Sequence, residues 1–268
     1  MIRVDGRIQQ RLFAWLVPAA VVLAWESAVR AGMLPPSQSA APSAIAVNLW
    51  QLLVSGDLFE HTMRSLARLV AGVALGSLAG VGSSLWLAGS RSADRLLSPS
   101  IQVLAGVPAI VWMPFWIMIW GTGEEFKVAM AAVTSFFLVH VYASHGIRSV
   151  GRQFVELAEM YEKTRLETIR EVLLPAALPT ILTAVRVTLG LGWIVIFFVE
   201  YASAQRGSEG LGWFISDARG VGRVEDEFAG LVFLAIMAFA TDRALGFLQR
   251  RLVAWSDTLE MSIVHGIR

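Results

Sequence analysis

The sequence predicts an all-α, polytopic membrane protein with about six transmembrane helices. Three observations support this fold class. Of the 268 residues, 56% are hydrophobic and 16% are charged, whereas soluble domains typically have about 45–50% apolar and about 25% charged residues. The mean hydropathy is +0.61. The charges are bunched between apolar segments that are long enough, as helices, to cross a hydrocarbon core of roughly 30 Å.

Six apolar segments are the expected spans, and all belong to one predicted domain that covers 1–268. The first is apolar except for Glu26 and measures about 27 Å at 1.5 Å per residue. No small-residue cleavage site follows it, so we expect a retained span rather than a signal peptide. Pro108 and Pro114 interrupt the third segment. The expected spans are 12–29, 69–88, 101–120, 126–146, 176–204 and 228–248.

Small residues recur every four positions in the second expected span and therefore share one face of the helix. They are Gly72, Gly76, Gly80 and Ser84. Small side chains let two helix backbones approach closely in lipid, where no hydrophobic force drives helices together. We interpret this stripe as a packing face rather than a binding site.

The positive residues predict how the chain is oriented in the membrane. Six spans place both termini on one side, and Lys and Arg outside the spans divide 13 to 7 in favour of that side. Positive residues accumulate in cytoplasmic loops. We therefore expect the termini, a polar turn at 89–100 and the polar stretch at 148–175 to be cytoplasmic.

Residues 150–175 form the only long polar stretch with a helical pattern in the C-terminal two-thirds of the chain, arranged as helix, short bend and helix. Apolar side chains stand among its charges, namely Phe154, Leu157, Met160 and Tyr161. A loop that is only solvated does not need them. Apolar residues with a charged rim favour a docking surface for a soluble partner over a plain connection.

The same stretch carries a spaced motif. Glu156, Leu157 and Ala158 precede the sequence Val-Leu-Leu-Pro, which ends at Pro175, 19 positions after Glu156. This resembles the EAA loop of the permease subunits of bacterial ABC importers. Five further segments resemble the nitrate/sulfonate/taurine branch of that family, in the family's order: LPPSQSAAPSAI, SGDLFEHTMRSLARLVAGVALG, LLPAALPTILTAVRVTLGLGWIVIFFVE, GLGWFISDAR and RRLVAW.

The resemblance implies a type I ABC importer-like permease whose loop contains a coupling helix that docks on an ATPase. The residues implied in this coupling are Glu156, Leu157, Ala158, Met160, Tyr161, Glu162, Lys163, Arg165, Leu174 and Pro175. The family's usual glycine falls on Glu162. Because glycine permits a positive φ that other residues avoid, we expect Glu162 to bend the chain in another way or to let the helix run longer.

The chain lacks a nucleotide-binding motif. Its only lysines, Lys127 and Lys163, follow Phe126 and Glu162, so no Gly-Lys-Ser/Thr phosphate loop exists. If ATP drives transport, the ATPase is a separate polypeptide that binds ATP–Mg. This chain is then not an enzyme, and the sequence predicts no cofactor or metal site on it.

The resemblance also implies the partners and the location. Two ATPase subunits would pair with a homodimer of this chain in the lipid of a bacterial cytoplasmic (inner) membrane, as a multi-pass protein. A periplasmic or lipid-anchored binding protein would deliver an oxyanion such as an aliphatic sulfonate, taurine or nitrate. The net charge of +1 gives no indication of nucleic acid. Two alternatives stay open, a gradient-driven secondary transporter and a non-transporting membrane scaffold.

Charged residues inside the spans are candidates for the pathway or a gate, because charge near the bilayer centre needs a partner or a function. Arg186 and Asp242 stand at similar predicted depth, and we expect them to pair. Glu200 lies about 21 Å further along its helix, so we expect it outside that cluster, as a gate or a helix-end charge. A stripe with four-residue spacing adds the candidates Trp112 and Trp116 and continues to Trp120.

Overall fold

The fold is built from helices throughout the described part of the chain. The computed structural model describes residues 6–203 and 209–253, with side chains from residue 15 onward. The chain termini and the last residue of the expected span 176–204 lie outside these ranges. The elements are α1 (Gly6–Arg30), α2 (Pro42–Ser55), α3 (Asp57–Ala88), α4 (Arg91–Ala105), η1 (Ala109–Trp112), α5 (Met113–Trp120), α6 (Glu124–Arg148), α7 (Arg152–Met160), α8 (Arg165–Thr168), η2 (Ile169–Leu173), α9 (Leu174–Ala202), α10 (Leu211–Gly220) and α11 (Val224–Leu252).

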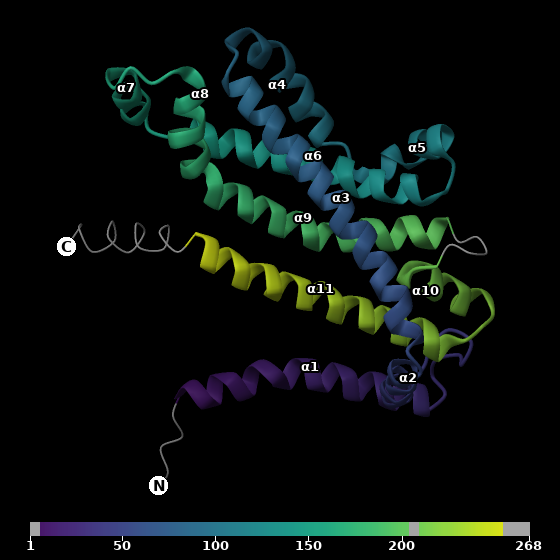
Figure 1. Cartoon of the computed structure of the whole chain (residues 1–268). Helices are drawn as coiled ribbons and strands as arrows, with labels where there is room; N and C mark the ends of the chain where they lie inside the picture. The colour runs from purple at the N-terminus through teal and green to yellow at the C-terminus, as the bar shows by residue number, and fades with distance from the viewer. Residues whose placement is uncertain (1–5, 204–208, 254–268) are drawn as a thin grey trace.

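Four helices in the described residues are long and apolar enough to cross a membrane. They are α3, α6, the continuous helix from α8 to α9, and α11. These helices contain the second, fourth, fifth and sixth expected spans, apart from the last two residues of the fifth, and α1 contains the first. Figure 1 shows α9 and α11 running side by side while α3 crosses both obliquely, with α7 and α8 at one end and α2 and α10 at the other.

The third expected span is not one continuous helix. Helix α4 and the η1–α5 segment meet at a bend of 100°, and they count as a fifth span only if the bent pair is a single crossing. The break falls at Gly106, Val107 and Pro108. Proline lacks an N–H and disfavours helical geometry in the residue before it, so α4 cannot continue through Pro108. Pro114, by contrast, stands in the first turn of α5, where proline is tolerated.

The expected polar turn at 89–100 is also wrong, because most of it is the start of α4. Ser90 caps this helix, its side chain accepting a hydrogen bond from the backbone N–H of Ala93 at 3.4 Å. Clusters of serine and aspartate are typical of turns. The same residues serve here as a cap and a charged first turn.

The glycine stripe of α3 is a packing face, as predicted. A Cβ added to Gly72 would lie 2.8 Å from the carbonyl oxygen of Val128, and one added to Gly80 would lie 2.9 Å from that of Phe136. Both acceptors belong to α6. The two backbones therefore touch along this stripe, and any side chain would separate them.

The hydrophobic core lies where α3, α6 and α9 meet. It contains Leu69, Val73, Ala131, Trp193 and Ile196, all at most 4% exposed. Helix α11 packs on α9 from outside this core, with few of its residues buried. The rings of Trp25 and Phe228, 5.7 Å apart, join α1 to α11.

Candidate functional site

The 150–175 loop presents an apolar surface at one end of the molecule. In α7, only Ala158 is buried against the rest of the chain. The side chains on its outer face stay exposed, Leu157 at 48%, Met160 at 81% and Tyr161 at 73%. Glu156 stands among them and accepts a hydrogen bond from Arg152 Nε at 2.8 Å. An amphipathic helix held by one small buried residue and showing large apolar side chains outward is suited to docking in a partner's cleft.

The chain turns sharply after α7 through Glu162. This residue has φ of 53°, the one positive φ outside glycine in the described residues. Its backbone N–H donates to the carbonyl of Glu159 at 2.9 Å, and that of Lys163 donates to Ala158 at 3.1 Å. This is the Schellman pattern of helix termination, which usually has glycine at the left-handed position. Contrary to our expectation, Glu162 neither extends the helix nor bends it by another route, but adopts the conformation of the missing glycine.

Helix α8 starts immediately after this turn with a complete capping box. Thr164 Oγ1 accepts from the N–H of Glu167 at 3.4 Å, and Glu167 Oε2 accepts from the N–H of Thr164 at 2.7 Å. The hydrogen bond from the Thr164 hydroxyl to the same carboxylate, with the backbone bond, holds the pKa of Glu167 below its usual value. Lys163 Nζ lies 2.9 Å from Glu171, and this hydrogen bond raises the pKa of the lysine. Arg165 is the first residue of α8 and is exposed.

A π-helical turn, η2, joins α8 to α9 in the residues just before Pro175. Proline cannot donate an N–H, and its ring collides with the carbonyl four residues earlier in an α-helix. The wider π turn accommodates the missing N–H donor and the proline ring without ending the helix. Leu174 packs on a cluster of Ala143, Ile147 and Ala177, which attaches the loop to α6.

Arg186 and Asp242 form the predicted pair between α9 and α11. Arg186 donates from Nε to Asp242 Oδ1 at 2.6 Å and from Nη2 to Oδ2 at 2.7 Å. This two-bond fork is the strongest arrangement of guanidinium and carboxylate. The guanidinium lies over Gly246, where a Cβ would come within 3.1 Å of Arg186 Cζ.

Glu200 is the centre of a second, separate cluster, and it is not a solvated helix-end charge. Its carboxylate is fully buried and accepts from Arg68 Nη1 at 2.6 Å, from Ser65 Oγ at 2.7 Å and from the N–H of Gly212 at 2.9 Å. Arg68 also binds Glu124 through two hydrogen bonds of 2.6 and 2.7 Å. The cluster joins α3, α6, α9 and α10, and α10 lies at the end of the molecule opposite α7 and α8 (Figure 1).

The tryptophan stripe is divided between η1, which ends at Trp112, and α5, which contains Trp116 and Trp120. The rings of Trp116 and Trp120 stack at 4.8 Å within α5, but Trp112 stacks on Phe137 of α6 at 6.3 Å. The indole N–H groups of Trp112 and Trp116 are buried and have no hydrogen-bond partner among the described residues. Trp112 and Trp116 nevertheless pack against the same buried cluster of Phe126, Met130 and Val199.

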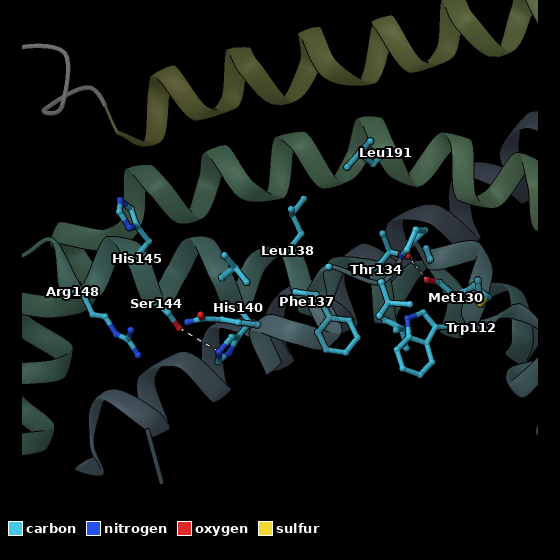
Figure 2. Close-up of a pocket in the computed structure, with 18 residues that line it drawn as sticks. Trp112, Met130, Thr134, Phe137, Leu138, His140, Ser144, His145, Arg148 and Leu191 are labelled. Carbon is cyan, nitrogen blue, oxygen red and sulfur yellow. Dashed lines mark hydrogen bonds between the residues drawn. The ribbon is translucent and has the colours of Figure 1, made fainter. Parts of the chain in front are cut away.

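An elongated cavity of about 650 Å³ lies between α6, the α4–η1 bend and Leu191 of α9 (Figure 2). Among the five pathway candidates, only Trp112 lines it. Sequence reasoning did not single out Arg148, Ser144 or Gln102, which also line it. A period of about 3.6 along α6 from Met130 to Arg148 is the signal that would have placed these α6 residues on one face.

The chain was compared with known protein families and structures. The family model of the binding-protein-dependent transport system inner membrane component matches residues 72–254. This chain belongs to that family. The matched residues run from the glycine stripe of α3 through the 150–175 loop to the end of α11. The loop, its buried Ala158 and the long helices are therefore parts of a transport-system membrane component.

Relatives within this family match nearly the whole chain. A putative aliphatic sulfonates transport permease protein, SsuC of Bacillus subtilis (strain 168), is 31% identical over 91% of this chain and 88% of the relative. The protein of the same description from Escherichia coli (strain K12) is 30% identical over 94% of both chains. A solved bacterial ABC transporter involved in the import of the acidic polysaccharide alginate superposes with a TM-score of 0.66 at 14% identity, over 92% of this chain and 97% of that chain. This last likeness shows the fold.

Proposed function

We propose that this chain is the permease subunit of an ATP-driven importer and that the 150–175 loop couples it to a separate ATPase. The observation that carries the proposal is the exposed apolar face of α7, which ends at the strained turn of Glu162. The substrate class is an oxyanion such as an aliphatic sulfonate, taurine or nitrate, supported by the sulfonate permeases among the relatives. A binding protein delivers it, and two copies of this chain form the membrane pathway.

Co-purification tests the coupling role. Met160→Asp places a charge in the centre of the apolar face, at a side chain that is 81% exposed and therefore not needed for folding. We expect this variant to lose the P-loop ATPase that co-purifies with the tagged wild-type protein in mild detergent. Ser92→Asp adds the same charge at an exposed position in the first turn of α4 and should retain the ATPase.

Uptake measurements separate this function from the two alternatives. Import that requires ATP and persists after the proton and sodium gradients are collapsed supports the importer. Import that stops with the gradients would instead indicate a secondary transporter. A complex that forms but moves no solute in reconstituted vesicles, with its ATPase and binding protein present, would indicate a scaffold.

The absence of cysteine from the chain makes its orientation directly measurable. We propose that both termini, α4 and α7 face the cytoplasm. Ser92→Cys and Gln153→Cys should then react with a membrane-impermeant maleimide only in inverted vesicles. Ser55→Cys, at the end of α2, should react from the outside of intact cells. The opposite labelling pattern would overturn the orientation.

A further inference from the structure

The cavity beside α6 is a groove that runs most of the way along this helix. Its floor consists of residues on one face of α6: Met130, Thr134, Phe137, Val141, Ser144 and Arg148. From Met130 to Arg148 the helix rises about 27 Å, close to the thickness of a hydrocarbon core. Its volume of about 650 Å³ falls within the typical range for small-molecule sites.

The groove changes in polarity along its length (Figure 2). Arg148, His145 and Ser144 line one end, whereas Trp112, Phe137, Met130 and Leu191 line the other. Gln102 also lines the groove and follows by one turn of α4 the Ser98 that binds Arg148. None of the residues that line it is acidic. An anionic group therefore meets hydrogen-bond donors and a cation at one end, and an attached apolar chain meets aromatic and aliphatic side chains at the other.

Arg148 keeps donors available for a ligand. Its Nη2 donates to Asp94 Oδ1 at 2.6 Å and to Ser98 Oγ at 3.2 Å. Its Nε and Nη1 have no partner among the described residues, and a guanidinium carries five N–H donors in all. Asp94 thus competes with a ligand for Arg148 at the mouth of the groove but does not use all of its donors.

We propose that this groove binds the transported substrate inside the membrane and that the substrate is an organic anion with an apolar chain. The oxyanion group binds at Arg148 and Gln102, and the chain extends along α6 toward Trp112. This inference rests on the proposed function, because it assigns the substrate class and the site of the same permease. An anionic lipid shares this chemistry, and the experiment below separates the two ligands.

Equilibrium binding of radiolabelled hexanesulfonate tests the site on the full-length permease in phosphatidylcholine nanodiscs. We expect saturable binding that unlabelled alkanesulfonates displace and that neither sulfate nor hexanol displaces at the same concentration. Arg148→Gln should raise the Kd about tenfold or more, the usual effect of losing a hydrogen bond to a charged group.

Asp94→Asn is the matched control for Arg148→Gln. Both variants remove the same ion pair between α4 and α6, but only Arg148→Gln removes the cation. We expect Asp94→Asn to leave the Kd unchanged or to lower it, because Arg148 loses its competing carboxylate. Equal weakening in the two variants would show that the ion pair acts only on the structure and would overturn the proposal.

A second pair of variants tests the apolar end. Trp112→Ala should reduce the preference for hexanesulfonate over ethanesulfonate, whereas Trp116→Ala, which removes an indole outside the groove, should not. The same change in both variants, or no saturable binding to the wild type, would overturn the site. So would displacement by phosphatidylglycerol without displacement by alkanesulfonates. None of these outcomes depends on ATPase co-purification, so the site can fail while the proposed function stands.

Discussion

Glu162 holds a backbone conformation that costs a residue with a Cβ about 1–2 kcal/mol. The Schellman hydrogen bonds from Glu162 and Lys163 keep it there. Glu162 therefore destabilises the turn relative to glycine, which would adopt the same φ without strain. Strained residues occur at functional sites, and this one lies between the apolar face of α7 and the start of α8.

Glu162→Gly should stabilise the turn by about 1 kcal/mol, because the left-handed conformation costs glycine nothing. Hydrogen exchange of the amides from 157 to 164 measures this, and the wild-type exchange should be faster. Glu162→Ala removes the carboxylate but keeps the Cβ, so its exchange should resemble that of the wild type. Equal protection in the Ala and Gly variants would show that the charge, and not the φ, limits the turn.

The cap of α8 should depend on pH through Glu167, which lies in the loop before the apolar part of the helix. Its pKa is lowered from 4.5 by the hydrogen bonds from Thr164. A depressed pKa means that the stabilisation is present above 4.5 and is lost as the pH falls through the lower, folded-state value. The hydrogen-exchange rate of the α8 amides, corrected for the intrinsic rate, should therefore increase as the pH falls through that range. In Thr164→Val, which loses the hydroxyl but keeps the backbone N–H that binds Glu167, this dependence should be smaller.

At the scale of elements, the contact between α3 and α6 sets the arrangement of the spans. A Cβ at Gly76 would lie 2.5 Å from Ser135 Cβ, so even alanine does not fit. A Cβ added to Gly82, six residues later on α3, would have nothing within 4 Å. One helix thus contains a glycine that packing requires and a glycine that packing does not.

Gly76→Ala should lower the free energy of unfolding by about 1–3 kcal/mol through overpacking. Gly82→Ala should raise it by about 0.5–1 kcal/mol, because alanine favours a helix more than glycine does. The melting temperatures of the two purified variants, measured in the same detergent, should therefore move in opposite directions. A drop of the same size in both would mean that helix propensity and packing are not separable here.

The sequence predicted this packing face because a repeat of four residues is visible within one helix. It also predicted the Arg186–Asp242 pair, because both depths follow from counting along apolar helices. It did not predict the surroundings of Glu200, whose partners Arg68 and Ser65 stand 132 and 135 positions earlier. It also missed the left-handed turn, because the glycine that usually marks it is absent. A local periodicity can be recognised in the sequence, whereas polar contacts between distant residues can be identified only once the tertiary fold is known.

At the scale of the whole molecule, the Glu200 cluster connects four helices at one end. Arg68 is 7% exposed and bridges two carboxylates, and Ser65 also accepts from the N–H of Leu211 at 2.8 Å. Removing one member of a buried ion pair leaves an uncompensated charge. The cluster therefore adds polar contacts to the apolar packing of α10 on α3 and α9.

Glu200→Gln should lower the free energy of unfolding by about 3 kcal/mol, the lower end of the range for broken buried pairs, because Arg68 keeps Glu124. Glu60 lies on the same helix as Arg68, and Glu60→Gln removes a carboxylate from an exposed pair with Arg64. This variant should change the free energy of unfolding by less than about 0.5 kcal/mol. Thermal unfolding measures both. If Glu200→Gln lowered the free energy of unfolding by no more than Glu60→Gln, the result would contradict the role of Glu200 as a buried residue that connects the helices.

The continuous helix from Arg165 to Ala202 has 38 residues and is about 57 Å long. It begins in the 150–175 loop and ends two residues beyond Glu200. A rotation of 1° about its α8 end sweeps the far end through about 1 Å, so about 5° moves it by roughly 5 Å. That exceeds the reach of the hydrogen bond between Arg68 and Glu200. As a rigid body, this helix would convert a small angular movement at the loop into the separation of Glu200 on α9 from Arg68 on α3 at the opposite end, without any relay of side chains between them.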